Sequence, residues 1–437
     1  MELIAQVLDY SNVNRAFKQV TANKGSAGVD GVKTTELGVY MQENWQRIKQ
    51  EIAIGTYKPQ SVLGIEIPKS NGGTRLLGIP TVIDRLIQQS IHQVLYPMYE
   101  VDFSEYSYGF RVGKNAHQGV QQALSYINQG YQYILDFDLK SFFDIVNHDY
   151  LMSLLYRKIK DKMLLKLIRR YLQSGILLNG LSQQRERGTP QGSPLSPLLS
   201  NIILNELDKE LEKRGLRFIR YADDFSIFVK SKRASERVKR GIINFVEHKL
   251  HLKINKEKSQ ICRPINYFTL GYGFVPTYQK GERGKYNLRV NPKSFKRLKQ
   301  KIKKLTRKTS PIPLQERLTR LEQISRGWVN YYRFAHISGK LNELDTWVRN
   351  RLRYCIWHDW KKPNKRMRSF IRLGIEQGQA YAWSRTRMGG WATAQSPIMK
   401  TTVTIKRLEQ RGYKSFTYLY TNSRRTMPEP QLKINFA

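Results

Sequence analysis

Two adjacent carboxylates, Asp223 and Asp224, stand between two short runs of β-forming residues, RFIRY and FSIFV. This pattern predicts a β-hairpin whose turn carries both aspartates. Two anions at one turn repel each other, and a hard divalent cation with oxygen ligands, most simply Mg2+, relieves that repulsion. Because aspartate is also common in ordinary surface turns, the pair alone leaves a purely structural turn open.

A second acidic stretch, YILDFDLKSFFDIVNHD, covers residues 133–149. Its first three residues predict a short buried strand, and Asp136 and Asp138 share one face of it. A carboxylate at the end of a buried strand is unfavourable unless it is paired or bound to metal. Carboxylates that hold two Mg2+ ions about 3.5–4 Å apart catalyse nucleotidyl transfer. The two acidic stretches together indicate that chemistry. Acyl transfer has no support, because no Ser or Cys nucleophile has a base at recognisable spacing.

Residues 62–80 predict another β-hairpin, with its turn at Asn71-Gly72-Gly73. Lys69 and Arg75 bracket that turn, so either they hold a triphosphate or they are solvated turn residues. Residues 188–194, GTPQGSP, predict a rigid turn that presents backbone N–H groups and leads into a long helix. Such a turn suits close approach to a base pair or a phosphate.

Other segments are expected to connect these elements. Residues 23–32 contain three glycines and predict a flexible loop, which is a lid, an RNA-touching arm or a plain connector. Residues 150–178 predict helices throughout. From about Lys362 the chain is basic and less regular, and a loop is expected from Arg385 to Trp391.

The charge balance indicates a polyanionic partner. The 437 residues include 75 Lys and Arg against 35 Asp and Glu, which gives a formal net charge of +40. Nucleic acid is the leading candidate. A membrane surface is the weaker one, because no run of about 18 apolar residues occurs. The only cysteines, Cys262 and Cys355, lie far apart in the sequence, which excludes a disulfide framework and a Cys-only zinc site and suits a reducing cytoplasm.

Residues 291–308, NPKSFKRLKQKIKKLTRK, predict an amphipathic helix in which every charged residue is basic. A merely solvated helix would carry acidic partners at i±4, and this one has none, so contact with a phosphate backbone is favoured. Further on, arginines mixed with Trp and Tyr suit stacking on RNA bases. We predict nucleic-acid contacts at Arg111, Lys296, Arg297, Lys299, Lys303, Arg326 and Arg333.

Taken in order, these motifs resemble those of the bacterial group II intron-encoded reverse transcriptase/maturase family, over nearly the whole chain. The polymerase part of the resemblance lies in IPKSNGGTRLLGIPTVIDRLIQQ, YSYGFRVGKNAHQGV, DFDLKSFFDIVNHDYLM, GTPQGSPLSPLLSNIILNELDKEL, RYADDFSIFV and LKINKEKS. RGWVNYYRFA and WHDWKKP resemble the thumb, or maturase, region, and SRTRMGGWATAQSP resembles the C-terminal DNA-binding part. Any one block would be weak, whereas their joint occurrence in this order is specific.

The resemblance implies the α/β (α+β) fold of a right-hand polymerase. It would have fingers and a palm with an antiparallel sheet, then an α-helical thumb and a basic C-terminal domain. The expected boundaries are 1–62 for an N-terminal extension and the start of the fingers, 63–285 for the fingers and palm reverse transcriptase domain, 286–362 for the helical thumb (maturase domain X) and 363–437 for the C-terminal DNA-binding domain.

The resemblance also implies a catalytic role for three carboxylates. Asp138, Asp223 and Asp224 would hold two Mg2+ ions, with the carbonyl of Leu139 as a further metal ligand and dNTP contact. Phe143 would lie under the incoming sugar and select dNTPs by excluding a 2′-hydroxyl.

Further dNTP contacts follow from the same resemblance. Gln191 would lie at the nascent base pair, Lys69 and Arg75 would hold the triphosphate, and Lys258 would assist the departure of pyrophosphate. Ser193 stands where many relatives have glycine, which would alter how the backbone approaches the template pair.

The implied function is an RNA-directed DNA polymerase that copies RNA into cDNA and also binds intron RNA as a maturase for splicing and retrohoming. Its partners would be intron RNA, an RNA template, a DNA primer or target and dNTPs, with no membrane and no zinc-dependent nuclease domain. Its location would be the bacterial cytoplasm, at the nucleoid. Two alternatives are a splicing-only RNA-binding maturase and a domesticated reverse transcriptase such as a phage-defence enzyme.

Overall fold

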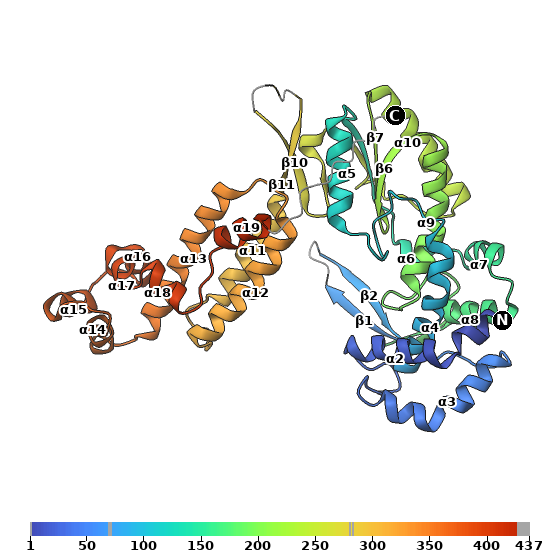
Figure 1. Cartoon of the computed structure of the whole chain (residues 1–437), viewed down its shortest axis with the longest axis horizontal. Coiled ribbons are helices and arrows are strands. Elements are labelled where there is room, and N and C mark those ends of the chain that lie inside the picture. Colours follow the sequence, from blue (N-terminus) through green and yellow to red (C-terminus); the bar gives the residue numbers. More distant parts are fainter. Residues whose placement is uncertain (1, 69–71, 279–280, 282–283, 426–437) are drawn as a thin grey trace. The chain divides into compact units, whose positions relative to one another are not determined.

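The structure, a computed structural model, describes residues 2–68, 72–278, 281 and 284–425. The chain divides into two compact units, residues 1–267 and residues 268–437 (Figure 1). Within the described residues, the first unit contains two four-stranded sheets and the second contains a three-stranded sheet followed by helices. Both acidic stretches belong to the first unit.

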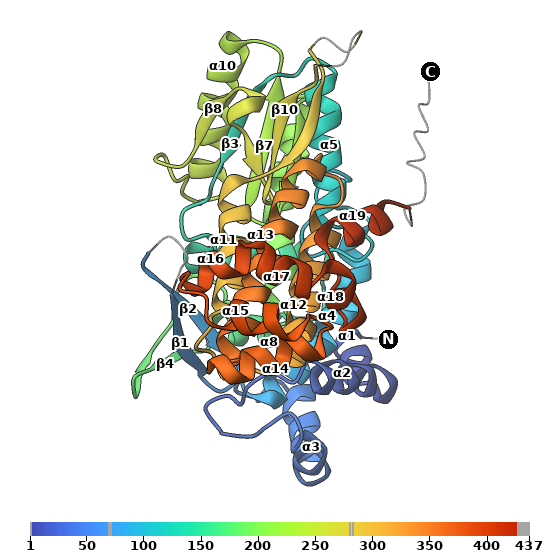
Figure 2. The same cartoon turned by 90° about the vertical axis from the view of Figure 1, so that its left-hand side faces the viewer.

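An antiparallel sheet of order β6-β7-β3-β8 carries both acidic stretches. Its strands are β3 (Tyr133–Phe137), β6 (Arg217–Tyr221), β7 (Asp224–Val229) and β8 (Gln260–Cys262). Figure 2 shows β3, β7 and β8 beside one another. The hairpin predicted around Asp223 and Asp224 is confirmed, because β6 and β7 pair with Tyr221 opposite Asp224.

Aromatic and aliphatic side chains hold this sheet together. The central strand β7 is buried from Phe225 to Val229. Phe137 of β3 stacks on Phe225 with ring centroids 4.8 Å apart. The sheet is covered by α5 (Ala116–Asn128), α9 (Ser196–Lys213) and α10 (Lys232–Asn244). Helices α5 and α9 contact β6, and α10 contacts β3 and β7, so the acidic strand ends project from a packed core.

The second sheet of this unit has the order β2-β1-β4-β5. Its strands are β1 (Val62–Pro68), β2 (Thr74–Ile79), β4 (Ile176–Leu178) and β5 (Leu181–Gln183). The predicted hairpin of residues 62–80 is confirmed by β1 and β2, which pair antiparallel. Asn71 and Lys69 at its turn lie outside the described residues.

The prediction of helices throughout residues 150–178 is wrong at its end. Helix α8 (Lys162–Gln173) stops before β4, which pairs in parallel with β1 and antiparallel with β5. The β4–β5 turn is Asn179-Gly180, with φ values of 51° and 81°. Asn-Gly is the dipeptide that best accommodates positive φ at both positions of a two-residue hairpin loop, so the signal was present in the sequence.

The remaining helices of the first unit precede or connect the strands. They are α1 (Leu3–Val7), α2 (Tyr10–Ala22), α3 (Leu37–Ala53), α4 (Val82–Glu100), α6 (Phe142–Ile145), α7 (His148–Lys158) and the short elements η1 (Phe245–Lys249) and η2 (Pro264–Asn266). The glycine-containing loop after α2 lies against the start of α4. A Cβ on Gly28 would lie 2.6 Å from the Thr81 Cα, and Arg85 donates a hydrogen bond to the Ser26 carbonyl.

The second unit opens with a sheet of order β11-β10-β9 and continues as helices. Its strands are β9 (Phe268–Thr269), β10 (Tyr272–Pro276) and β11 (Tyr286–Val290). Its helices are α11 (Pro292–Leu305), α12 (Leu314–Tyr332), α13 (Ser338–Asp359), α14 (Pro363–Arg372), α15 (Gln377–Ser384), α16 (Gly390–Gln395), α17 (Pro397–Thr402), α18 (Ile405–Gln410) and α19 (Phe416–Arg425). The predicted basic helix is confirmed as α11.

The region after Lys362 is more regular than predicted. Short helices follow one another from α14 to α19, and Trp391 lies in α16 and not in a loop. Its ring meets Tyr354 of α13 edge-on, at a centroid distance of 5.6 Å. Such contacts between short helices are tertiary, so periodicity within each helix does not reveal them. None of the helices in the described part of the chain combines the length and apolar character needed to cross a bilayer.

Candidate active site

The three aspartates lie at adjoining strand ends of the β6-β7-β3-β8 sheet. Strands β6 and β7 are joined by a two-residue loop, Ala222-Asp223, and Ala222 has a φ of 57°. Strand β3 pairs with β7 so that Phe137 lies opposite Phe225. Asp138 follows Phe137 and Asp224 precedes Phe225, and the charge of Asp138 acts on Asp224. The strand end and the hairpin turn therefore bring the two acidic stretches together.

Mutual repulsion is the main electrostatic feature of this edge. Partial removal from bulk water, with the charges of Asp223, Asp138 and Asp136, raises the pKa of Asp224 to about 7. Asp224 is exposed at the turn, so the three neighbouring carboxylates raise its pKa more than the loss of water does. Burial also raises the pKa of Asp223, where the charge of Asp138 adds to the effect and Arg75 opposes it.

The segment LKINKEKS borders Asp138. The Asn255 amide donates to Asp138 Oδ2 at 3.0 Å, and Lys258 Nζ lies 3.2 Å from the same oxygen. Leu139 forms a β-bridge with Ile254, which fixes the backbone whose carbonyl we expect to bind metal. Lys258 is thus beside Asp138, and its role toward pyrophosphate stays a prediction. Asn255 was missed, although its place three residues before Lys258 in a turn-forming stretch is a usable signal.

The GTPQGSP turn contacts the β1–β2 hairpin through hydrogen bonds. Arg75 Nε donates to Gln191 Oε1 at 2.5 Å, and the Gly78 N–H donates to the Gln191 carbonyl at 2.8 Å. A Cβ on Gly192 would lie 2.8 Å from the Gly78 carbonyl, so glycine is needed for this approach. Two predicted dNTP contacts, Arg75 and Gln191, are therefore direct neighbours. Ser193 is buried and donates to Gln88.

The same turn holds the backbone around Phe143. The Thr189 N–H donates to the Phe143 carbonyl at 2.6 Å, and the Gly188 N–H donates to the Val146 carbonyl at 2.8 Å. Gly188 has a φ of 86°, and a Cβ there would lie 2.6 Å from the Phe143 carbonyl. His148 Nε2 lies 2.7 Å from the Gly188 carbonyl. The half-buried Phe143 side chain is thus set by the turn that also carries Gln191.

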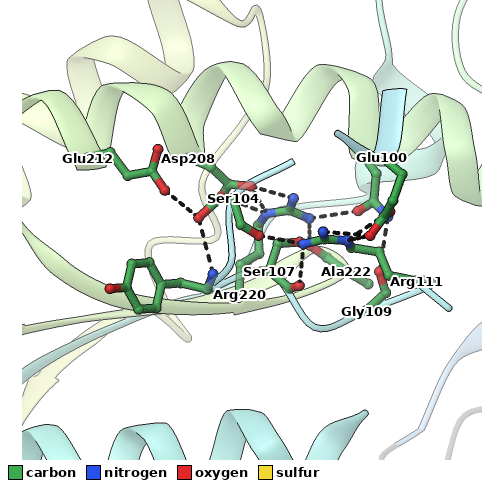
Figure 3. Close-up of polar contacts among 11 residues, drawn as sticks. Glu100, Ser104, Ser107, Gly109, Arg111, Asp208, Glu212, Arg220 and Ala222 are labelled. Carbon is green, nitrogen blue, oxygen red and sulfur yellow. Dashed lines mark hydrogen bonds and ion pairs between the residues drawn. The ribbon is translucent and has the colours of Figure 1, made fainter. Parts of the chain in front are cut away.

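The prediction that Arg111 contacts nucleic acid is not supported by its surroundings. Its side chain is 5% exposed and forms an ion pair of 2.7 Å with Glu100. It also donates to the carbonyls of Ser104 and Ser107 (Figure 3). All three nitrogens of this guanidinium donate to acceptors inside the protein, so Arg111 fixes a loop. Sequence alone could not reveal its partners, because Glu100 meets it only through the fold.

The other predicted nucleic-acid contacts belong to the second unit. Lys296, Lys299 and Lys303 are exposed on α11 and line a pocket of about 360 Å³ with Trp347. Arg297 of the same helix is also exposed. Of the other two predicted contacts, Arg326 forms an ion pair with Glu322, and the guanidinium of Arg333 lies over the Phe334 ring. The α11 cations therefore form a solvent-facing basic surface.

The candidate metal ligands at the end of β3 and at the β6–β7 turn suit Mg2+. They are carboxylate oxygens, and the carboxylates of Asp223, Asp138 and Asp136 act on Asp224 as like charges that a cation would neutralise. Mg2+ is commonly held by one or two carboxylates and completed by water and substrate phosphates, so it needs no ready-made protein cage. The described residues form no cluster of three or more His, Cys, Asp or Glu that would be such a cage.

Comparison with known proteins decides the family. Residues 67–274 match the family described as reverse transcriptase (RNA-dependent DNA polymerase), and residues 295–373 match the group II intron, maturase-specific domain. The chain is 32% identical to Protein YkfC of Escherichia coli over 286 residues, which are 56% of this chain and 75% of that protein. It is 30% identical to the group II intron-encoded protein LtrA of Lactococcus lactis over 371 residues, 69% of this chain and 59% of LtrA. This chain belongs to the group II intron reverse transcriptase/maturase family.

The family assignment places the candidate site in a polymerase domain. The reverse transcriptase match contains Asp138, Asp223 and Asp224, and the maturase match contains most of α11 and all of α12 and α13. The chain thus has an RNA-directed DNA polymerase domain of mixed α and β structure, followed by a helical maturase region. Among solved structures, a chain of a partial Cas6-RT-Cas1–Cas2 complex is 26% identical, with a TM-score of 0.38, over 57% of this chain and 43% of that one.

Proposed function

We propose that this member of the group II intron reverse transcriptase/maturase family copies RNA into cDNA with two Mg2+ ions and binds intron RNA to assist splicing and retrohoming. The observation that carries the polymerase part is the register of β3 and β7. It pairs Phe137 with Phe225, and the residues that follow Phe137 and precede Phe225 are Asp138 and Asp224, with Asp223 at the adjoining turn. Family membership and the basic surface of α11 support the maturase part.

The palm carboxylates act as the metal-holding group. Asp138, Asp223 and Asp224, with the Leu139 carbonyl, would hold the ions. Two bound Mg2+ ions would lower the pKa of the attacking 3′-hydroxyl and neutralise the negative charge of the triphosphate and of the leaving pyrophosphate. The Lys258 ammonium lies 3.2 Å from Asp138, where it can donate a proton to the departing pyrophosphate or stabilise its negative charge.

The fingers and the GTPQGSP turn position the dNTP. Arg75 offers a guanidinium to the triphosphate, and its partner Gln191 lies where the nascent base pair forms. Lys69 is proposed for the same triphosphate. Phe143, held by its backbone contact with Thr189, closes the space below the sugar C2′ and so excludes a 2′-hydroxyl.

Primer extension on an RNA template with Mg2+ and dNTPs tests the polymerase proposal. Asp223→Ala should abolish extension, because a metal ligand is lost, while RNA binding stays within about twofold. Asp149→Ala is the matched control, because this aspartate is exposed on α7 and its side chain is 79% exposed. An Asp223→Ala variant with wild-type extension would refute the assignment.

Splicing of the cognate intron RNA tests the maturase part and separates the alternatives. The dual-function proposal predicts that Asp223→Ala removes cDNA synthesis and leaves splicing assistance intact. A wild-type protein that assists splicing without any cDNA synthesis would be a splicing-only maturase. A protein that makes cDNA and assists no splicing would be a domesticated reverse transcriptase.

A further inference from the structure

Arg220 lies two residues before Ala222 of the β6–β7 turn, and its side chain points away from the site and into the protein. It is the largest fully buried side chain of the first unit and forms an ion pair with Asp208 of α9, both side chains being 0% exposed. Its Nε donates to Asp208 Oδ1 at 2.8 Å, and its Nη2 donates to Asp208 Oδ2 at 2.5 Å. Figure 3 shows this guanidinium directed at α9. The proposed roles in polymerase chemistry and in nucleic-acid binding do not explain why the charged side chain of Arg220 is buried at this position.

The remaining nitrogen of Arg220 reaches the catalytic turn itself. Nη1 donates to the Ala222 carbonyl at 3.1 Å and to Asn201 Oδ1 at 2.9 Å. Ala222 has a φ of 57°, in the left-handed region that a non-glycine residue occupies at a cost. A bond from a buried, fixed guanidinium to the carbonyl of that residue stabilises the conformation that presents Asp223.

The loop that contains Gly109 packs against the same turn from the other side. Asn201 donates to the Gly109 carbonyl at 3.0 Å, which connects this loop to the Arg220 network. A Cβ on Gly109 would lie 2.3 Å from the Ala222 nitrogen, closer than real Cβ atoms come to a neighbour. The loop backbone also brackets Arg220, whose N–H donates to Tyr106 and whose carbonyl accepts from Tyr108. Arg111 in turn fixes this loop to Glu100.

We propose that Arg220 is a positioning residue, which sets the metal-binding geometry of the Ala222-Asp223 turn by bonding the Ala222 carbonyl while Asp208, Asn201 and the Gly109 loop hold it in place. This inference rests on the metal-binding role that the proposed polymerase function gives to Asp223. Arginine is required because one planar group serves Asp208 and the turn at once, whereas a lysine ammonium is a single point of charge on a flexible stem.

Arg220→Lys tests the proposal, because it keeps the buried charge opposite Asp208 and removes the bond to the turn. We expect Mn2+ affinity, measured by the free-Mn2+ signal in electron paramagnetic resonance, to fall by about tenfold or more. Turnover in primer extension should fall by on the order of 100-fold with RNA binding retained. Arg317→Lys is the matched control. This arginine is equally buried, in the second unit, and also donates to backbone carbonyls, so its replacement should leave Mn2+ affinity unchanged.

Gly109→Ala tests the other side of the turn and leaves the Arg220–Asp208 pair intact. The added Cβ displaces Ala222, so Mn2+ affinity should again fall, whereas Gly38→Ala, whose Cβ would meet only Phe17 at 3.8 Å, should not change it. If Arg220→Lys does not fold, Gly109→Ala decides. Wild-type Mn2+ affinity in the folded variants, or no Mn2+ bound by the wild-type protein, would overturn the inference. Weakened Mn2+ binding with a wild-type protein that extends no primer would support the inference and refute the polymerase proposal.

Discussion

Lys258 Nζ lies 3.2 Å from Asp138 Oδ2, although 120 residues separate the two in sequence. The contact exists because the segment around Asn255 runs alongside the end of β3, where the Asn255 N–H donates to the Asp138 carbonyl at 2.8 Å. A cation thus lies beside the carboxylates, at the strand ends where we place the leaving pyrophosphate.

Replacing Lys258 should therefore affect catalysis more than stability. The side chains of the pair are 58% and 30% exposed, so the ion pair contributes at most about 1 kcal/mol to folding. We expect Lys258→Ala to lower kcat by about 100-fold and to leave Tm nearly unchanged. Lys256→Ala removes the same charge from an exposed position two residues away and serves as the control. Equal kcat values for the two variants would argue against the assigned role.

Phe143 should determine the choice of sugar. Phe143→Ala opens space below the sugar C2′, so the ratio of kcat/KM for dNTP over rNTP should fall by about tenfold or more. The side chain is half-buried, and the backbone contacts of its carbonyl with Thr189 remain. Single-nucleotide incorporation with dGTP and GTP measures the ratio. An unchanged ratio in a folded variant would exclude Phe143 as the residue that excludes the 2′-hydroxyl.

Cys262 should resist alkylation in the folded protein. Burial, with a further contribution from the Asp136 charge, raises the pKa of this thiol to about 12. Since the raised pKa favours the protonated form, only about one thiol in 10,000 is ionised at pH 8, against about a quarter for an ordinary cysteine. Labelling with iodoacetamide at pH 8 should be at least about 1,000-fold slower in the native protein than in urea. Comparable rates would show that β8 does not shield Cys262.

The sequence predicted the candidate catalytic residues but not the residues that surround and support them. Asp138, Asp223 and Asp224 could be found because each interrupts an apolar strand pattern, and the strand period of two fixes which side chains share a face. The hairpins at residues 62–80 and 217–229 followed from the same alternation and from turn residues. Helices α14 to α19 were missed because their contacts are with one another and with α13.

Arginine shows where sequence reasoning ends. Arg111 lies in an aromatic, glycine-broken loop and Arg297 in a basic helix, and both looked equally able to meet an anion. The fold buries the first against Glu100 and leaves the second exposed. Arg220 stands in the most recognisable motif of the chain, yet its partner Asp208 is twelve residues earlier on a different element. Such pairings depend on how helices pack on the sheet, which local patterns do not encode.

The exposed cations of α11 should set the salt dependence of RNA binding. Lys296, Lys299 and Lys303 are exposed on one helix, and each phosphate contact that they make releases a counterion. Replacing all three by alanine should reduce the slope of log K against log salt concentration by about 2 to 3. Filter binding of the cognate intron RNA between low and high KCl measures this slope. The triple alanine variant of Lys160, Lys162 and Lys166 removes the same charge from the first unit, so a slope reduced equally by both variants would show a net-charge effect and not contact by α11.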